Sequence, residues 1–100
     1  MLEINALMMD ITDNVVTCVE EVPAGGTVVY RKGKEICSLT AEETIPYCHK
    51  IALESLELGA DVYKYGELIG RTSAPIAKGH WVSHKNIYSV PRDYESEYQK

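Results

Sequence analysis

Three histidines are the side chains of this sequence best suited to proton transfer or metal binding. They are His49, His80 and His84. Imidazole titrates near neutral pH and is the commonest transition-metal ligand, so each is a candidate for such a role. In an extended strand the spacing of His80 and His84 places both on one face, with Trp81 facing away. For a single histidine, however, a surface or structural role is the commoner outcome.

The densest polar segment is a second candidate site. It runs from Lys64 to Arg71, with Glu67 standing between Gly66 and Gly70. This arrangement would bring a carboxylate close to cations, or bring the cations to the carboxylate of a ligand. A solvated hairpin with ordinary surface charges explains the segment nearly as well.

No complete catalytic motif accompanies these candidates. The sequence contains no nucleophile elbow, no glycine-rich phosphate loop before a helix and no two-histidine helical metal motif, so catalytic residues stay unassigned. Cys18, Cys37 and Cys48 are odd in number and never two residues apart. This spacing fits neither a disulfide framework nor a zinc knuckle, so we expect reduced thiols that act as small hydrophobic residues.

Short β-strands joined by turns are predicted to position these side chains. Apolar residues alternate, or run in short β-branched stretches, between glycines and prolines. The segments Asn14–Val19 and Thr27–Tyr30 are the clearest strands, and Pro23–Gly26 between them has turn composition. Arg31–Lys34 predicts a second hairpin connection, leading into Glu35–Leu39. The N-terminal half is therefore predicted to be a meander.

Two segments are less clear. Thr40–Glu43 has the form of a helix capping box, but Pro46 leaves room for barely one turn, so a short helical turn stays open. Asn86–Val90 is a candidate closing strand. We expect residues 1–91 to form one domain and residues 92–100 to form a polar tail, either frayed or serving as an arm that docks on a partner.

An aliphatic residue, a glycine three positions later and a β-branched residue after another three positions recur along the chain. Each copy places one apolar anchor before a turn and one after it, with a glycine free to adopt positive φ at the corner. In one copy Cys48 replaces the glycine, so that corner either does not require positive φ or tolerates strain. The copies are Val22–Val28, Ile45–Ile51, Leu56–Val62 and Ile76–Val82.

Composition and charge limit the function. A chain of 100 residues that is 45% hydrophobic and 25% charged supports one ordered domain. The net charge of −5 argues against binding to nucleic acid. The first basic residue is Arg31, and no apolar run is long enough to span a membrane. We therefore expect a cytoplasmic protein without nucleic-acid or membrane partners.

Three stretches together resemble a known family, the SAF domain of altronate and galactarate dehydratases, over residues 10–91. The small subunit of sulfolactate sulfo-lyase is similar too. The stretch through Lys-Tyr-Gly-Glu and Ile-Gly is the most specific part. The stretches are Ile45–Leu53, Val62–Arg71 and Gly79–Asn86.

The resemblance implies an all-β, β-clip fold of short strands and hairpins with glycine-cornered turns. It implies a small subunit that acts with a large dehydratase subunit on a sugar acid, in a lyase reaction assisted by a divalent metal, by resemblance iron. The residues that match the family motifs, and are expected to bind substrate, are His49, Lys50, Lys64, Tyr65, Gly66, Glu67, Gly70 and Asn86. We expect His49, Lys50 and the Lys64–Gly70 loop to face one cavity that another polypeptide completes.

The sequence also departs from the family pattern. Where the family has His-x-His-Asn, this chain has Ser83, His84, Lys85 and Asn86. His84 is the one candidate metal ligand left there, and it points to the other face of a strand unless the register slips. The alternative is a non-enzymatic module that binds a ligand or forms homo-oligomers, for which seven tyrosines are available. The substrate and the metal are not fixed by the sequence.

Overall fold

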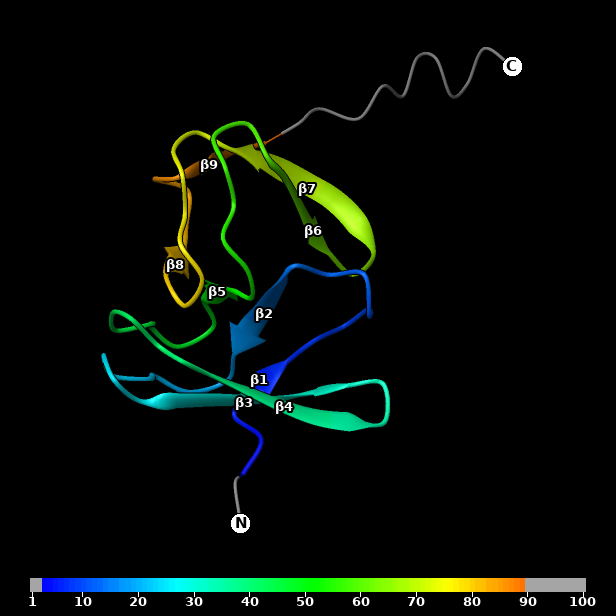
Figure 1. Ribbon diagram of the computed structural model, residues 1–100, viewed down its shortest axis with the longest axis vertical. Coiled ribbons are helices and arrows are strands. Elements are labelled where there is room, and N and C mark those ends of the chain that lie inside the picture. Colours follow the sequence, from blue (N-terminus) through cyan, green and yellow to red (C-terminus); the bar gives the residue numbers. More distant parts are fainter. Residues whose placement is uncertain (1–2, 90–100) are drawn as a thin grey trace.

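The computed structural model describes residues 3–89, and within this range the chain is all-β without a helix (Figure 1). The predicted fold class is therefore confirmed, and the helical turn left open at Thr40–Glu43 does not form. Over the same range, no helix capable of crossing a membrane is found. The predicted tail and the domain boundary at residue 91 lie outside the described residues. The strands are β1 Ala6–Leu7, β2 Val15–Cys18, β3 Thr27–Lys32, β4 Glu35–Thr40, β5 Lys50–Ala52, β6 Asp61–Lys64, β7 Glu67–Thr72, β8 Trp81–Val82 and β9 Ile87–Tyr88.

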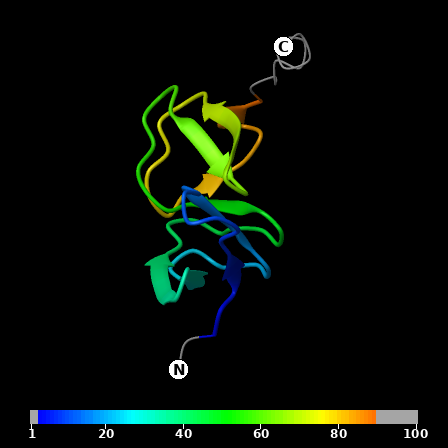
Figure 2. The same ribbon diagram turned by 90° about the vertical axis from the view of Figure 1, so that its right-hand side faces the viewer.

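The strands form three antiparallel sheets. The central sheet has four strands in the order β1-β2-β5-β8, the β3–β4 hairpin forms a second sheet, and a third has the order β6-β7-β9. Figure 1 shows the central sheet between the β3–β4 hairpin below and the β6-β7-β9 sheet above, and Figure 2 shows the same stacking from the side. The predicted strands and both turns of the N-terminal half are present. The predicted meander is wrong, because β2 pairs with β1 and β5 instead of β3.

Two hydrophobic cores lie on opposite faces of the central sheet. Alternate side chains of its strands enter different cores, as in Val16 and Val15 of β2, and this is why the strand is apolar on both faces. The first core faces β3–β4 and contains Ala6, Val16, Cys18, Val22, Val28, Leu39, Ala41, Ile45 and Ile51. The second core faces β6-β7-β9 and contains Val15, Ala52, Leu56, Val62, Ile76 and Val82.

The four repeated copies pair with one another. Isolated bridges join Val22 to Ile45 and Leu56 to Ile76, so each hairpin is closed at its base by two copies. The corner position has positive φ in every copy, and at Cys48 φ is 65°. Of the two alternatives at this corner, tolerated strain is therefore the correct one, because a residue with a Cβ is disfavoured in the left-handed region.

The two halves of the chain also share a backbone hydrogen-bond pattern. Cys18 N–H donates to the carbonyl of His49 at 2.9 Å, and Ala52 N–H donates to the carbonyl of His80 at 3.0 Å. His49 and His80 thus occupy equivalent positions, each just after a corner with positive φ.

Candidate functional site

The turn between β6 and β7 is held by a buried carboxylate. Tyr65 and Gly66 both have positive φ, as a two-residue hairpin turn of this type requires. Asp13, which is 5% exposed, accepts hydrogen bonds from Tyr65 N–H at 3.0 Å and Gly66 N–H at 2.8 Å. The tip of the predicted Lys64–Gly70 site is therefore fixed by a loop that lies 52 residues earlier.

The two glycines of this predicted site have structural tasks. A Cβ on Gly70 would collide with the carbonyl oxygen of Tyr88, so the glycine lets β9 approach β7. A Cβ on Gly66 would lie 2.9 Å from Oδ2 of Asp10. Close packing against backbone therefore explains Gly70, and the positive φ of the turn explains Gly66.

Lys50 and Lys64 form a cationic pair, in which the two charges lie within electrostatic reach of one another and the ammonium of Lys64 also lies 4.9 Å from the centre of the Tyr65 ring. Lys50 is half-buried in β5, and burial, followed by the charge of Lys64, lowers the pKa of its ammonium group. Neither lysine has an ion-pair partner among residues 3–89, although Glu67 lies opposite Lys64 in the hairpin. Two cations within electrostatic reach repel one another where neither forms an ion pair, and an anionic ligand relieves that repulsion.

A buried hydroxyl lies beside Lys50. Thr17 is the cross-strand partner of Lys50 in the β2–β5 ladder. Its Oγ1 is inaccessible to solvent and has no hydrogen-bond partner within residues 3–89. Buried polar groups are normally paired, so this hydroxyl adds an unused donor and acceptor next to the cationic pair.

His49 lies on the other side of the central sheet from Lys50. Its Nδ1 accepts a hydrogen bond of 3.1 Å from Trp81 Nε1, and the two rings meet edge to face at 82°. Trp81 packs against the first core, whereas Ala52 and Val82, which share the face of Lys50, belong to the second. The structure therefore places Lys64 within electrostatic reach of Lys50 but does not bring His49 to them, so within residues 3–89 these three side chains do not face one cavity.

The segment after β8 turns instead of continuing as a strand. Asn86 Oδ1 accepts from Ser83 N–H at 2.8 Å, and its Nδ2 donates to the carbonyl of Trp81 at 2.7 Å. Asn86 thus closes the turn with its own amide. His84 is exposed within this turn, and His80 instead bonds to Glu43, so the predicted shared strand face for His80 and His84 is wrong.

Residues 3–89 contain no cluster of side chains that could bind a metal ion. Nowhere in that range do three His, Cys, Asp or Glu side chains gather around one point. The predicted role of His84 stays a prediction that needs ligands from another chain. The described residues therefore do not fit a resident iron by themselves, and we derive no step through one.

Sequence reasoning missed several residues that shape these surfaces. Asp13 and Thr17 lie far from the motif residues in the chain, and only the sheet topology brings them together. Glu43 was assigned to a capping box, where a glutamate is expected to bond to the backbone, but its carboxylate bonds to β8 instead. The sequence signal that could have identified Asp13 is the adjacent pair Asp13 and Asn14, because aspartate and asparagine side chains often bond to the backbone of turns.

Two comparisons with known proteins bear on this geometry. Residues 4–90 match the family model described as the altronate/galactarate dehydratase SAF domain. A search of curated proteins found no match to the chain. The matched range contains every residue of the cationic pair, the β6–β7 turn and the His49–Trp81 contact.

Proposed function

The chain belongs to the altronate/galactarate dehydratase SAF domain family, and from that premise we propose that it is the small subunit of a cytoplasmic sugar-acid dehydratase. In this proposal it acts with a large catalytic subunit and has no lyase activity alone. The substrate is a sugar acid such as altronate or galactarate.

The observation that carries the proposal is the match of residues 4–90 to the family model, and the pair formed by Lys50 and Lys64 supports it. A cation that is half-buried beside another cation is held there at an energetic cost, and a carboxylate ligand neutralises both. The hydroxyl of Thr17, the cross-strand partner of Lys50, is closed off from solvent, so it would bond to the ligand only after neighbouring side chains move. These features support binding of the acid group of the substrate by this face of the central sheet.

The expected reaction begins with removal of a proton from the carbon next to the carboxylate. Cations at the carboxylate favour this step, because negative charge develops on its oxygens as the proton leaves. The hydroxyl group on the next carbon then takes up a proton from an acid group and leaves as water, and a double bond forms between the two carbons. We assign Lys50 and Lys64 to binding and charge stabilisation, and we expect the large subunit to supply the base and to hold the divalent metal.

The test is co-expression with a large dehydratase subunit. We expect a stable complex that dehydrates altronate or galactarate in a reaction dependent on divalent metal, and Lys50→Met should raise KM for the acid at least tenfold. The matched control is Lys32→Met in the exposed tip of β3–β4. Failure to form any complex, or equal activity of both variants, would count against the proposal. Sulfolactate as a second substrate distinguishes a sulfo-lyase.

One observation favours a second candidate, a non-enzymatic ligand-binding or oligomerising module. Ser83 and Lys85 stand where the resembled family has histidines, and Asn86 is occupied in closing its turn. In that case the isolated chain should bind a sugar acid, or form a stable homo-oligomer, without a large subunit. Calorimetric titration and sedimentation of the pure chain measure these two outcomes.

A further inference from the structure

Glu43 fixes the protonation pattern of His80. Its Oε2 accepts hydrogen bonds from His80 Nδ1 at 2.9 Å and from the backbone N–H of Trp81 at 3.1 Å. An ionised carboxylate can only accept, so the proton of the imidazole lies on Nδ1. A neutral His80 therefore presents the lone pair of Nε2 as a hydrogen-bond acceptor.

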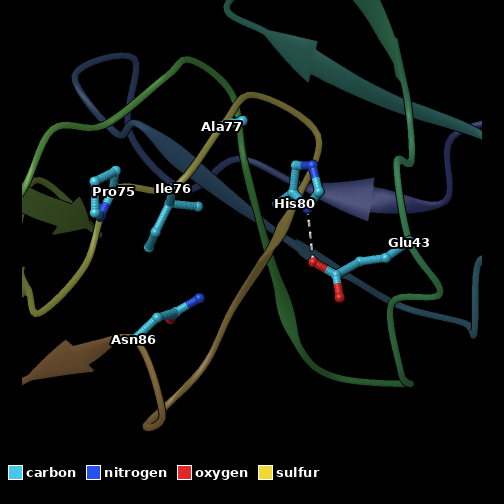
Figure 3. Close-up of a pocket in the computed structure, with 6 residues that line it drawn as sticks. All are labelled: Glu43, Pro75, Ile76, Ala77, His80 and Asn86. Atoms are coloured by element: carbon cyan, nitrogen blue, oxygen red, sulfur yellow. Dashed lines mark hydrogen bonds and ion pairs between the residues drawn. The ribbon is translucent and has the colours of Figure 1, made fainter.

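A pocket of about 340 Å³ adjoins this pair (Figure 3). Glu43 and His80 lie on one side of it, with Pro75, Ile76 and Asn86 on the other. The amide of Asn86 is already bonded at both its oxygen and its nitrogen. Within residues 3–89 Glu43 Oε1 has no hydrogen-bond partner, so this oxygen and Nε2 of a neutral His80 are the acceptors that the pocket offers, while the amide nitrogen of Asn86 keeps one N–H as a donor. Such a pocket suits ligand groups that donate hydrogen bonds and disfavours a bare carboxylate.

The equivalent histidine of the other half has the opposite arrangement. His49 Nδ1 accepts from Trp81 Nε1, and an indole N–H can only donate. The proton of a neutral His49 therefore lies on Nε2, which makes this histidine a donor. The acceptor character of His80 is thus set by Glu43 and does not follow from the repeated backbone position.

We propose that Glu43 and His80 form a subsite that binds hydroxyl groups of a polyhydroxylated ligand. The inference rests on the proposed function, in which the hydroxyl groups belong to the sugar acid. It assigns them acceptors that lie apart from Lys50 and Lys64, the groups proposed for the acid end. Trp81 is a positioning residue here, because its backbone N–H holds the carboxylate of Glu43 in place.

The first test reads the imidazole protons directly. In the full chain labelled with ¹⁵N-histidine, at a pH where neutral imidazole predominates, long-range ¹H–¹⁵N spectra should show the proton on Nδ1 of His80 and on Nε2 of His49. Glu43→Ala should abolish the preference at His80, and Glu54→Ala, on an exposed loop, should leave it unchanged. A proton on Nε2 of His80 in the unaltered chain would overturn the proposal.

The second test measures ligand binding by the same resonances. Galactitol and galactarate should both shift the Nε2 signal of His80, whereas adipate, a diacid without hydroxyl groups, should not. Glu43→Ala should weaken the binding of galactitol about tenfold or more, since it removes a charged acceptor. Glu43→Gln, which keeps an acceptor oxygen, should weaken it less and serves as the second variant if the first does not fold.

The outcomes separate the two proposals. The hydroxyl subsite would be overturned by equal responses of His80 to galactitol and adipate, or by no response to galactitol and galactarate. Either result would leave the co-expression result unchanged. Failure of the chain to form a complex with a large subunit would overturn the proposed function, while the response of His80 to galactitol would still support the subsite.

Discussion

At the scale of single residues, Lys50 connects stability with function. Its pKa is lowered in the folded protein by burial and by Lys64, so the folded state binds fewer protons than the unfolded state as pH approaches 10.5, the ordinary value. Stability contributed by this group is therefore lowest where the lysine is charged, and it rises as pH increases through the folded pKa. A charge that lowers the stability of the fold in this way is expected of a group that is retained because it binds a ligand.

Replacement of this charge should stabilise the isolated chain. Lys50→Met is expected to raise Tm at pH 7 by a few degrees, because the methionine fills the same half-buried space without a desolvated charge. The gain should shrink at high pH, where Lys50 is already neutral. Thermal melts followed by circular dichroism at both pH values measure this, with Lys32→Met as the exposed control. A lower Tm for Lys50→Met at pH 7 would contradict the assignment.

The thiols should differ sharply in reactivity. Burial, with a smaller contribution from the charge of Glu20, raises the pKa of Cys18 to about 11, so its thiolate is scarce at neutral pH. Cys48 is exposed at its corner, and Cys37 is intermediate. A disulfide-exchange reagent at pH 8 should label Cys48 first and leave Cys18 unlabelled until denaturant is added. Loss of the fast phase in Cys48→Ser identifies it; fast labelling that survives this change would show the ordering to be wrong.

The motif residues could be recognised from the sequence, but their grouping could not. Lys50 and Lys64 were both named, and the structure places them within electrostatic reach of one another. His49 is adjacent to Lys50 in the chain, yet strand alternation sends the two side chains to different faces. The adjacency of His49 and Lys50 in the sequence suggests one motif, because the register of β5 is set only by tertiary pairing.

At the scale of elements, the β6–β7 hairpin depends on contacts from outside itself. Asp13→Asn should destabilise the protein by about 2–3 kcal/mol, because a carboxylate that accepts from two backbone N–H groups of the turn becomes an amide with one acceptor oxygen. Urea unfolding measures the loss, and Glu20→Gln provides an exposed control. A change below about 0.5 kcal/mol would show that the turn holds its shape without Asp13.

Two glycines allow the effect of close packing to be separated from the effect of positive φ. Gly59 has a φ of 79° and open space where a Cβ would lie, so Gly59→Ala should lose only about 1–2 kcal/mol. Gly70→Ala should lose more than about 3 kcal/mol, because its Cβ would collide with the backbone of Tyr88. Urea midpoints of the two variants compare these losses directly. Equal losses would mean that β9 is free to move away from β7.

Local sequence patterns predicted hairpins well and failed where tertiary contacts decide. Turn composition and β-branched runs identified β2, β3 and β4 to within a few residues. The capping-box pattern at Thr40–Glu43 competed with backbone pairing of Ala41 to Gly26 at 2.9 Å and with the bonds of Glu43 to β8, and the tertiary contacts won. The meander was wrong because β2 is a central strand that pairs with β1 before it and with β5, which follows the β3–β4 hairpin in the chain.

At the scale of the whole molecule, the two cores share one sheet. Ile51 of β5 enters the first core and Ala52 the second, so neither half can keep its core if the central sheet separates. The repeated halves, each a hairpin closed by two copies of the corner motif, resemble two small domains in sequence. The shared strands make them one folding unit in the structure.

We therefore expect the chain to unfold in a single transition. Trp81, the sole tryptophan, packs against the first core, and its fluorescence should change at the same urea concentration as the circular dichroism of the whole chain. Val82→Ala removes apolar contacts only from the second core, yet it should move the Trp81 transition by the same amount as the dichroism transition, with a loss of about 1–3 kcal/mol. Ile51→Val in the first core is the matched comparison. If Val82→Ala moved the dichroism transition while the Trp81 transition stayed in place, the two halves would unfold independently. The central sheet would then not hold the cationic pair and the Glu43–His80 pocket in a fixed position relative to one another.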